Sequence, residues 1–205
     1  ETGTVFAVKN KAGMFSGQTW DMHGSATPYI LSMDFNGQKI LTVTGCLGLA
    51  GVNSSSLAIY INNVHGLERN SKGLMWPGLV RLMLDDSSSG EAAETLKKSL
   101  PSSAHNYLIV DNSTAINIEA TSDRWVVTGR IDGVEGFLFH TNHFVDTNLM
   151  KIENMDRQSK TTLKRYEAMK NLSLDGQWKS QNLIEIKEKI LNLSLIHISE
   201  PTRQL

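Results

Sequence analysis

Residues 17–21, Gly-Gln-Thr-Trp-Asp, place a carboxylate close to the start of the chain. They lie on the second of two short apolar runs, so we expect Asp21 about one hairpin away from the first residues. That arrangement suits an enzyme whose nucleophile is the first residue of a mature chain. The free amine can act as the base for its own side chain, so no separate histidine is needed. None of the first three residues is a cysteine, however.

A second group of residues that could take part in chemistry is His140, His143 and Asp146, which could be interpreted as ligands of a metal ion. Residues three apart on a strand face opposite sides of the sheet. This spacing therefore suits zinc poorly, and we expect neither a metal nor a cofactor.

The single cysteine, Cys46, follows Gly45 and could be mistaken for a nucleophile exposed by cleavage. It lies downstream of Asp21, so cleavage there would leave that carboxylate on the other fragment. A small buried thiol is the better interpretation. Gly48 and Gly51 could suggest a phosphate-binding loop, but the Gly-Lys-Ser/Thr that such a loop requires does not follow them. We therefore expect these glycines to allow a tight turn of the main chain.

The composition is that of one globular domain, with 205 residues, 40% hydrophobic residues and a net charge of -1. Basic and acidic residues are interspersed, which argues against a nucleic-acid partner. No apolar run approaches the length of a membrane-spanning helix, so we expect no membrane association. One cysteine excludes an internal disulfide framework and slightly favours a reducing, cytoplasmic compartment. The expected partner is a small molecule.

The last residues have a different origin from the rest. Residues 193–203 match the translation of a transposon-based sequencing adapter residue for residue. Such scars are excluded from fold reasoning, and we interpret residues 193–205 as an artefact. Residues 1–192 then form a single incomplete domain, which we expect to be truncated at its C-terminus and which could also be cut at its start.

The hydrophobic pattern predicts strands, then two helices, then strands, then helices. Asn36-Gly37 is a strong hairpin signal, and residues 88–91 resemble a capping box that opens a helix. Segregated blocks of this kind favour a layered α+β domain. The expected strands are 5–8, 13–20, 29–35, 40–44, 57–61, 107–110, 115–119, 125–128 and 136–139. The expected helices follow Pro77 and Ser88 and span 159–170 and 183–191.

Together these blocks resemble the acyl-CoA:6-aminopenicillanic acid acyltransferase-type peptidase family, which is related to cholylglycine hydrolases and penicillin V acylases. The matching segments are Phe-Ala-Val at 6–8, GQTWDMHGSATP at 17–28, GLAGVNSSSLAIYINN at 48–63, HNYLIVD at 105–111 with IEAT at 118–121, and HTNHF at 140–144. The resemblance implies a four-layer αββα N-terminal-nucleophile hydrolase fold. It also implies self-cleavage at a Gly-Cys bond and acyl transfer from an amide through a thioester.

The resemblance places the nucleophile at Gly3, counting back from Asp21 and Phe6. Glycine cannot attack a carbonyl, so three alternatives stay open. The codon for cysteine could be misread, since a single base separates the two residues. Catalysis could have been lost. Thr2 could also be the nucleophile once Glu1 is removed, because threonine with its own amine is chemically workable.

The remaining site residues are also implied by the resemblance. Asp21 would orient the nucleophile and the new amine. Asn63, with an uncertainty of one position toward Asn62, and Asn142 would hold the oxyanion, because neutral amides stabilise the charge of a tetrahedral intermediate. Their simpler alternatives are a strand-end carboxylate and turn-forming asparagines.

The related hydrolases also use an arginine nearer the C-terminus. We expect Arg157 and Arg165 to lie on a helix surface or in salt bridges, and the catalytic arginine to lie beyond the chain. The predicted function is an amidase or acyltransferase acting on a small N-acyl or peptide-like substrate. An inactive homologue that keeps the pocket as a binding module is the alternative, and a purely structural domain is a weaker one.

Overall fold

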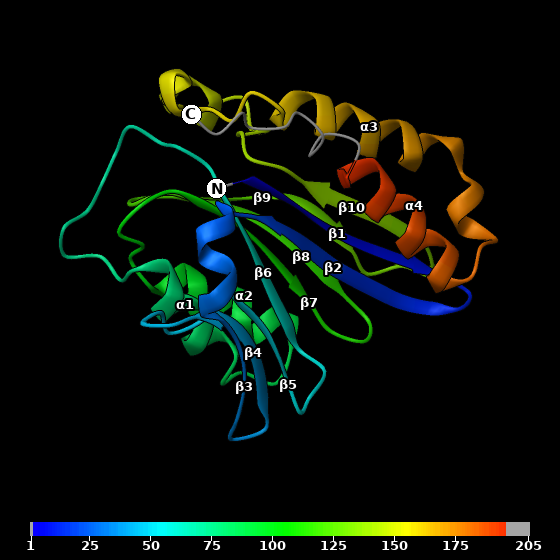
Figure 1. Cartoon of the computed structure of the whole chain (residues 1–205), viewed down its shortest axis with the longest axis horizontal. Coiled ribbons are helices and arrows are strands. Elements are labelled where there is room, and N and C mark those ends of the chain that lie inside the picture. Colours follow the sequence, from blue (N-terminus) through cyan, green and yellow to red (C-terminus); the bar gives the residue numbers. More distant parts are fainter. Residues whose placement is uncertain (1, 196–205) are drawn as a thin grey trace.

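Two antiparallel sheets form the centre of the molecule, with a pair of helices on each side (Figure 1). The structure is a computed structural model and describes residues 2–195. The smaller sheet has the strand order β10-β1-β2, and the larger has the order β3 to β9 in sequence. The smaller sheet comprises β1 (Thr2–Asn10), β2 (Gly13–Asp21) and β10 (Gly136–His140). The larger comprises β3 (Ile30–Phe35), β4 (Gln38–Val43), β5 (Ala50–Asn53), β6 (Ala58–Asn63), β7 (His105–Val110), β8 (Ala115–Ala120) and β9 (Trp125–Ile131).

The helices divide between the two outer faces. Their bounds are α1 (Trp76–Met83), α2 (Ser89–Lys98), α3 (Thr162–Asp175) and α4 (Leu183–Leu195), with short 3₁₀ turns η1 (Gly24–Tyr29), η2 (Leu149–Ile152), η3 (Met155–Arg157) and η4 (Gln177–Lys179). Helices α1 and α2 share one hydrophobic core with the larger sheet. Helices α3 and α4 share another with the smaller sheet. The order of layers is therefore αββα, as expected.

Strand β1 contains an unbroken apolar run, residues 5–8, because both of its faces are buried. Val5 and Ala7 point into the core between the sheets, whereas Phe6 and Val8 point into the core beneath α3 and α4. Successive side chains of a strand face opposite sides, so a strand buried on both faces must be apolar at every position. This burial fixes the register of β1 and with it the position of the first residues.

Local signals set the boundaries as predicted. Asn36 and Gly37 have φ values of 49° and 74°, the left-handed pair that a tight β-hairpin requires. The Ser88 hydroxyl accepts a hydrogen bond from the Glu91 amide at 3.3 Å and caps α2. Gly176, with φ of 70°, ends α3. None of the helices within residues 2–195 is long and apolar enough to cross a membrane.

Three details differ from the expectation. The sequence pattern missed β5, because residues 45–51 read as a glycine-rich turn. Tyr29 closes η1 and does not begin a strand. Cys46 is only half-buried and lies in the turn after β4. Of the suspected adapter tail, residues 193–195 complete α4, and residues 196–205 lie outside the described residues.

Candidate active site

The hairpin of β1 and β2 brings Asp21 to the start of the chain. In its register Thr2 lies opposite Asp21, and Gly3 lies opposite Trp20. Asp21 is half-buried, and Gly3 is buried. The structure therefore places the predicted carboxylate one residue pair away from the predicted nucleophile position.

Side chains from three distant segments hold the main chain of Gly3. Its amide donates to Oδ1 of Asn142 at 2.9 Å. Its carbonyl oxygen accepts from Nη1 of Arg165 at 2.6 Å and from Nδ2 of Asn62 at 3.1 Å. Buried main-chain groups need partners, but strand pairing normally supplies them. At Gly3 side chains supply them instead.

Arg165 corrects the expectation that the arginines of this region lie on a helix surface. Its side chain is buried with the residue only 3% exposed, and it donates to Gly3, to the Thr4 hydroxyl at 3.1 Å and to Asn142 Oδ1 at 2.7 Å. Burial lowers the pKa of its guanidinium, and the charge of Asp21 opposes that shift. A buried arginine from α3 thus contacts the main chain at position 3. Arg157, by contrast, is exposed.

Asn142 acts as a clamp between the two sheets. Its Oδ1 accepts from Gly3 and Arg165, and its Nδ2 donates to the carbonyl oxygen of Asn63 at 3.0 Å. Its own amide donates to the Thr162 hydroxyl at 2.7 Å. This geometry fits an acceptor that orients the amine of residue 3. We predicted that Asn142 donates to the oxyanion. Its Nδ2 group carries two hydrogens, and one of them is donated to the carbonyl oxygen of Asn63.

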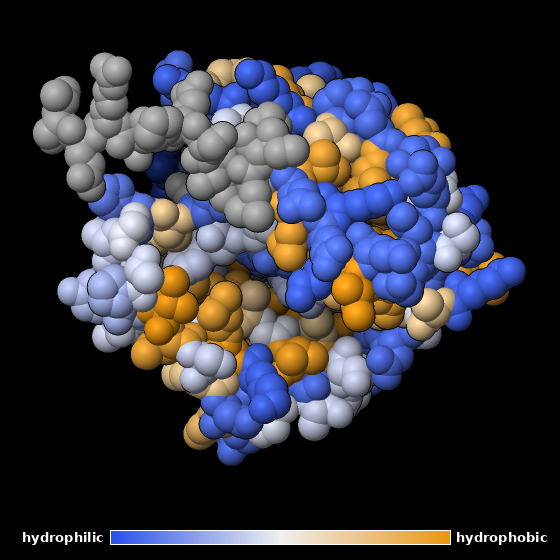
Figure 2. All heavy atoms as spheres, turned by 45° about the vertical axis from the view of Figure 1, so that its right-hand side comes forward, coloured by the Kyte–Doolittle hydropathy of each residue, from blue (hydrophilic) through white to orange (hydrophobic). Residues whose placement is uncertain are grey.

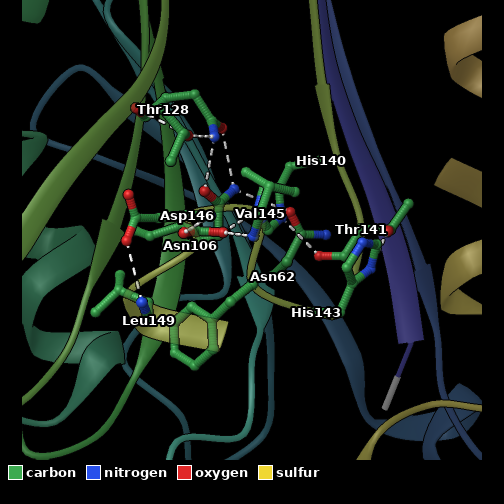
Figure 3. Close-up of polar contacts among 12 residues, drawn as sticks. Asn62, Asn106, Thr128, His140, Thr141, His143, Val145, Asp146 and Leu149 are labelled. Carbon is green, nitrogen blue, oxygen red and sulfur yellow. Dashed lines mark hydrogen bonds and ion pairs between the residues drawn. The ribbon is translucent and has the colours of Figure 1, made fainter. Parts of the chain in front are cut away.

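The loop that carries Asn142 is braced by the buried carboxylate of Glu119, and Figure 3 labels the residues His140, Val145 and Asp146 that contact this carboxylate. Glu119 accepts from the amides of Val145 and Asp146 at 2.6 and 3.1 Å, and its Oε1 lies 2.7 Å from Nε2 of His140. Nδ1 of His140 donates to the carbonyl oxygen of Thr141 at 2.8 Å. Both ring nitrogens of His140 are thus engaged by residues that position this loop.

His143 completes this brace from the other side. Its ring stacks on that of His140 with centroids 6.4 Å apart, and its Nδ1 lies 2.9 Å from the Thr162 hydroxyl. Burial, followed by the neighbouring His140, lowers the pKa of His143 to about 4. The ring is therefore neutral at physiological pH.

Asn62 is supported by a row of buried polar side chains across four strands (Figure 3). Its Oδ1 accepts from Asn106, which exchanges hydrogen bonds with Asn117 at 3.0 and 2.9 Å. Asn117 also donates to the Thr128 hydroxyl at 2.6 Å. A satisfied polar network of this kind rigidifies the core that contains it. It holds the side-chain amide of Asn62 on the carbonyl oxygen of Gly3.

A small pocket opens at Gly3. The residues that line it are Gly3, Gln18, Trp20, Leu49, Ile61, Asn62, Asn63, Trp76 and Asn142. The predicted residues Gly3, Asn63 and Asn142 therefore meet at one pocket, while Cys46 is not among its lining residues. The side chain of Thr2 has no described placement.

Glycine fits closely at position 3. A Cβ atom built there would lie 2.4 Å from the carbonyl oxygen of Thr19, a distance that side chains do not tolerate. A larger residue at this position would need the start of β1 to move away from β2.

Several functional residues escaped the sequence pattern. Arg165 lies on a helix with little amphipathic character, so nothing marked its face as buried. A signal did exist for Asn106, Asn117 and Glu119, because each is a polar residue inside an otherwise apolar strand. Polar residues at such positions need partners, and here the partners form the site.

Comparisons with known proteins agree with this fold. The chain resembles a Caenorhabditis elegans N-acylethanolamine-hydrolyzing acid amidase ortholog with a TM-score of 0.63 and 14% identity, over 98% of this chain and 88% of that one. It resembles penicillin V acylase from Agrobacterium tumefaciens with a TM-score of 0.57 and 13% identity, over 99% and 74%. These likenesses confirm the N-terminal-nucleophile hydrolase fold. No curated protein sequence matches the chain. A family model matches residues 8–196, and the chain belongs to the acyl-coenzyme A:6-aminopenicillanic acid acyl-transferase family.

Proposed function

We propose that this fold hydrolyses the amide bond of a small N-acyl compound, or transfers its acyl group, through a nucleophile at position 3. One observation carries the proposal. Both main-chain polar groups of Gly3 are held by Asn142, Arg165 and Asn62 at the mouth of a pocket. Such an arrangement serves a residue that becomes an amino terminus, because it orients the new amine and the group next to it.

The chemistry requires a cysteine at position 3 and cleavage of the bond before it. The free amine then takes the thiol proton, and the thiolate attacks the amide carbonyl. The Oδ1 atom of Asn142 and the carboxylate of Asp21 hold the amine and thiol in place, and the nearby cation of Arg165 favours the thiolate.

Later steps use the neutral amides of the site. In this proposal the oxyanion of the tetrahedral intermediate is stabilised by the neutral side-chain amide of Asn63. The departing amine takes a proton from the α-ammonium group and leaves a thioester on residue 3. Water or an acceptor amine then attacks the thioester, and the outcome is hydrolysis or transfer.

An apolar hollow beside the pocket suits the acyl group. It has a volume of about 220 Å³ and is lined by Gln18, Trp20, Lys39, Leu41, Leu49, Ala50, Gly51, Val52 and Tyr60. Gln18, Trp20 and Leu49 line both this hollow and the pocket at Gly3. Figure 2 shows apolar side chains gathered around a hollow in the lower half of the molecule. Burial of an acyl chain here would contribute about 0.8 kcal/mol per methylene.

A second candidate function follows from the close fit of glycine. The position of Thr19 leaves no room for a Cβ atom at position 3 in the uncut chain. This favours a binding module that keeps the amide pocket and lacks the nucleophile. In that case the chain as printed binds N-acyl compounds and leaves them intact.

Amide hydrolysis by the Gly3→Cys variant distinguishes the two functions. We expect Gly3→Cys to release amine from N-acyl substrates, and Gly3→Ala, which adds bulk without a thiol, to release none. Adding Asp21→Asn to Gly3→Cys should reduce the rate strongly while the fold is retained. A folded, substrate-binding Gly3→Cys protein with no amidase activity would favour the binding module.

A further inference from the structure

A basic hollow lies on the other side of the pocket at Gly3. It has a volume of about 160 Å³, and its lining includes Arg69, Arg157, His65 and His105. Asn63 and Trp76 line both this hollow and the pocket at Gly3. Within the described residues, no aspartate or glutamate is among its lining residues.

The two arginines of this hollow are available for a ligand. Neither Arg69 nor Arg157 forms an ion pair or a side-chain hydrogen bond with any residue between 2 and 195. Other surface arginines of the chain do pair, as Arg124 does with Asp123 and Arg130 with Asp132. Two guanidinium groups at one concavity form a site for a carboxylate, because each can donate two parallel hydrogen bonds to it.

The positive charge of these arginines also affects the pKa values of the two histidines in the hollow. Burial lowers the pKa of His65, and the charges of Arg157 and Arg69 lower it further. His105 is buried, its pKa is lowered to about 4, and Arg69 again contributes to the shift. Both rings are thus neutral neighbours of two cations, and the hollow carries a net positive charge.

The order of the three sites along the surface assigns the parts of a substrate. The apolar hollow shares residues with the pocket at Gly3, and that pocket shares other residues with the basic hollow. An amide whose carbonyl lies at Gly3, with its acyl chain in the apolar hollow, has its amine portion directed to the basic one. We infer that the basic hollow binds a carboxylate on the amine portion, so that the substrates are N-acyl amino acids. This inference rests on the proposed function.

Binding to the chain as it exists tests the inference, because glycine at position 3 has no side chain that could attack the amide. The probes are N-octanoylglycine and N-octanoylethanolamine, which differ only in that the first has a carboxylate where the second has a hydroxymethyl group. Titration calorimetry measures the affinity of the chain for each. We expect the acid to bind about tenfold more tightly than the alcohol, as a charge-assisted pair predicts. Arg69→Gln and Arg157→Gln should each reduce this preference, and the double variant should abolish it. Arg130→Gln, a surface arginine outside the hollow, should leave it unchanged.

The outcomes separate this inference from the function on which it rests. Equal binding of the two probes overturns the carboxylate site and leaves the amide site intact. Failure of both probes to bind contradicts the proposed function itself. A preference for the acid that survives the double variant places the carboxylate elsewhere and overturns the inference. Arginine-dependent binding of inorganic phosphate, without any preference for the acid, overturns it in favour of a phosphate ligand.

Discussion

The amide of Gly3 donates to Oδ1 of Asn142 across 139 residues of sequence, at 2.9 Å. This hydrogen bond joins the first strand to a loop that follows β10. The same oxygen accepts from Arg165, and the same side chain donates to Asn63. One side-chain amide thus connects the start of the chain, the end of strand β6 in the larger sheet and helix α3. Its removal should affect the fold as well as the site.

We expect Asn142→Ala to lower the free energy of unfolding by about 2–4 kcal/mol, because it removes three buried hydrogen bonds, one of them to a cation. Urea unfolding followed by circular dichroism measures the loss. Asn148→Ala, in an exposed position of the same region, should change it by less than about 0.5 kcal/mol. Similar values for the two variants would contradict the clamp.

Arg165→Lys tests whether the planar fork of arginine is needed. The guanidinium serves Gly3, Thr4 and Asn142 at once, and an ammonium group cannot reach all three acceptors in that geometry. We expect a loss of about 2–4 kcal/mol in unfolding free energy, as for a buried charge whose partners are left incomplete.

The matched control for Arg165→Lys is Arg130→Lys, because Arg130 is exposed and pairs only with Asp132. In the Gly3→Cys background, Arg165→Lys should also slow amide hydrolysis beyond what its stability loss explains. A lysine variant with unchanged stability and unchanged rate would remove Arg165 from the site.

Glu119→Gln tests the brace behind the Asn142 loop. A glutamine keeps one acceptor oxygen, so it cannot accept from both Val145 and Asp146 while it also faces His140. We expect faster hydrogen exchange at the amides of Val145 and Asp146 and a stability loss of about 2–4 kcal/mol. Glu167→Gln on the exposed face of α3 should show neither effect, and unchanged protection in Glu119→Gln would contradict the brace.

Stability should fall in mild acid because two histidines are buried in neutral form. The pKa values of His105 and His143 are lowered to about 4 in the folded chain, against about 6.5 in the unfolded chain. The unfolded state therefore binds more protons between these values. Stability is fully present above pH of about 6.5 and is lost as the pH falls toward about 4.

The variant that isolates this effect is His105→Gln, which cannot take up the proton. Between pH of about 6.5 and about 4, the unfolding free energy of this variant should fall less than that of the parent chain, by an amount on the order of 3 kcal/mol. Urea unfolding at a series of pH values measures the slope. His23→Gln, at an exposed position on η1, should keep the slope of the parent chain. An identical slope in His105→Gln would show that this ring is not buried in neutral form.

The architecture was predictable because β1 and the central strands have strong hydrophobic patterns. Alternation of apolar and polar residues, and turn residues such as Asn36-Gly37, identify strands locally. The order of strands and helices then favours a layered α+β fold. The pairing of β1 with β10 was not visible, because it joins residues such as Val5 and His140 that lie far apart in sequence. This pairing is a tertiary contact at the second edge of β1, which no local pattern reports.

The site was predictable in part for a similar reason. Asp21 lies on the same hairpin as Gly3, so local spacing places it. Arg165 reaches Gly3 only because α3 packs on the smaller sheet, and no local pattern reports that contact. The roles of the neighbours Asn62 and Asn63 could not be distinguished from sequence, since only the polar row behind Asn62 shows which amide is held on the carbonyl oxygen of Gly3.

The intact mass of the Gly3→Cys protein tests the central claim most directly. If residue 3 is the nucleophile position, the purified variant should lose every residue before position 3. The shortened chain should then gain the mass of one acyl group on residue 3 when it is mixed with an N-acyl substrate and denatured rapidly. Gly3→Ala should keep its full mass and gain nothing. A folded Gly3→Cys protein that remains uncut and carries no acyl group would contradict the account.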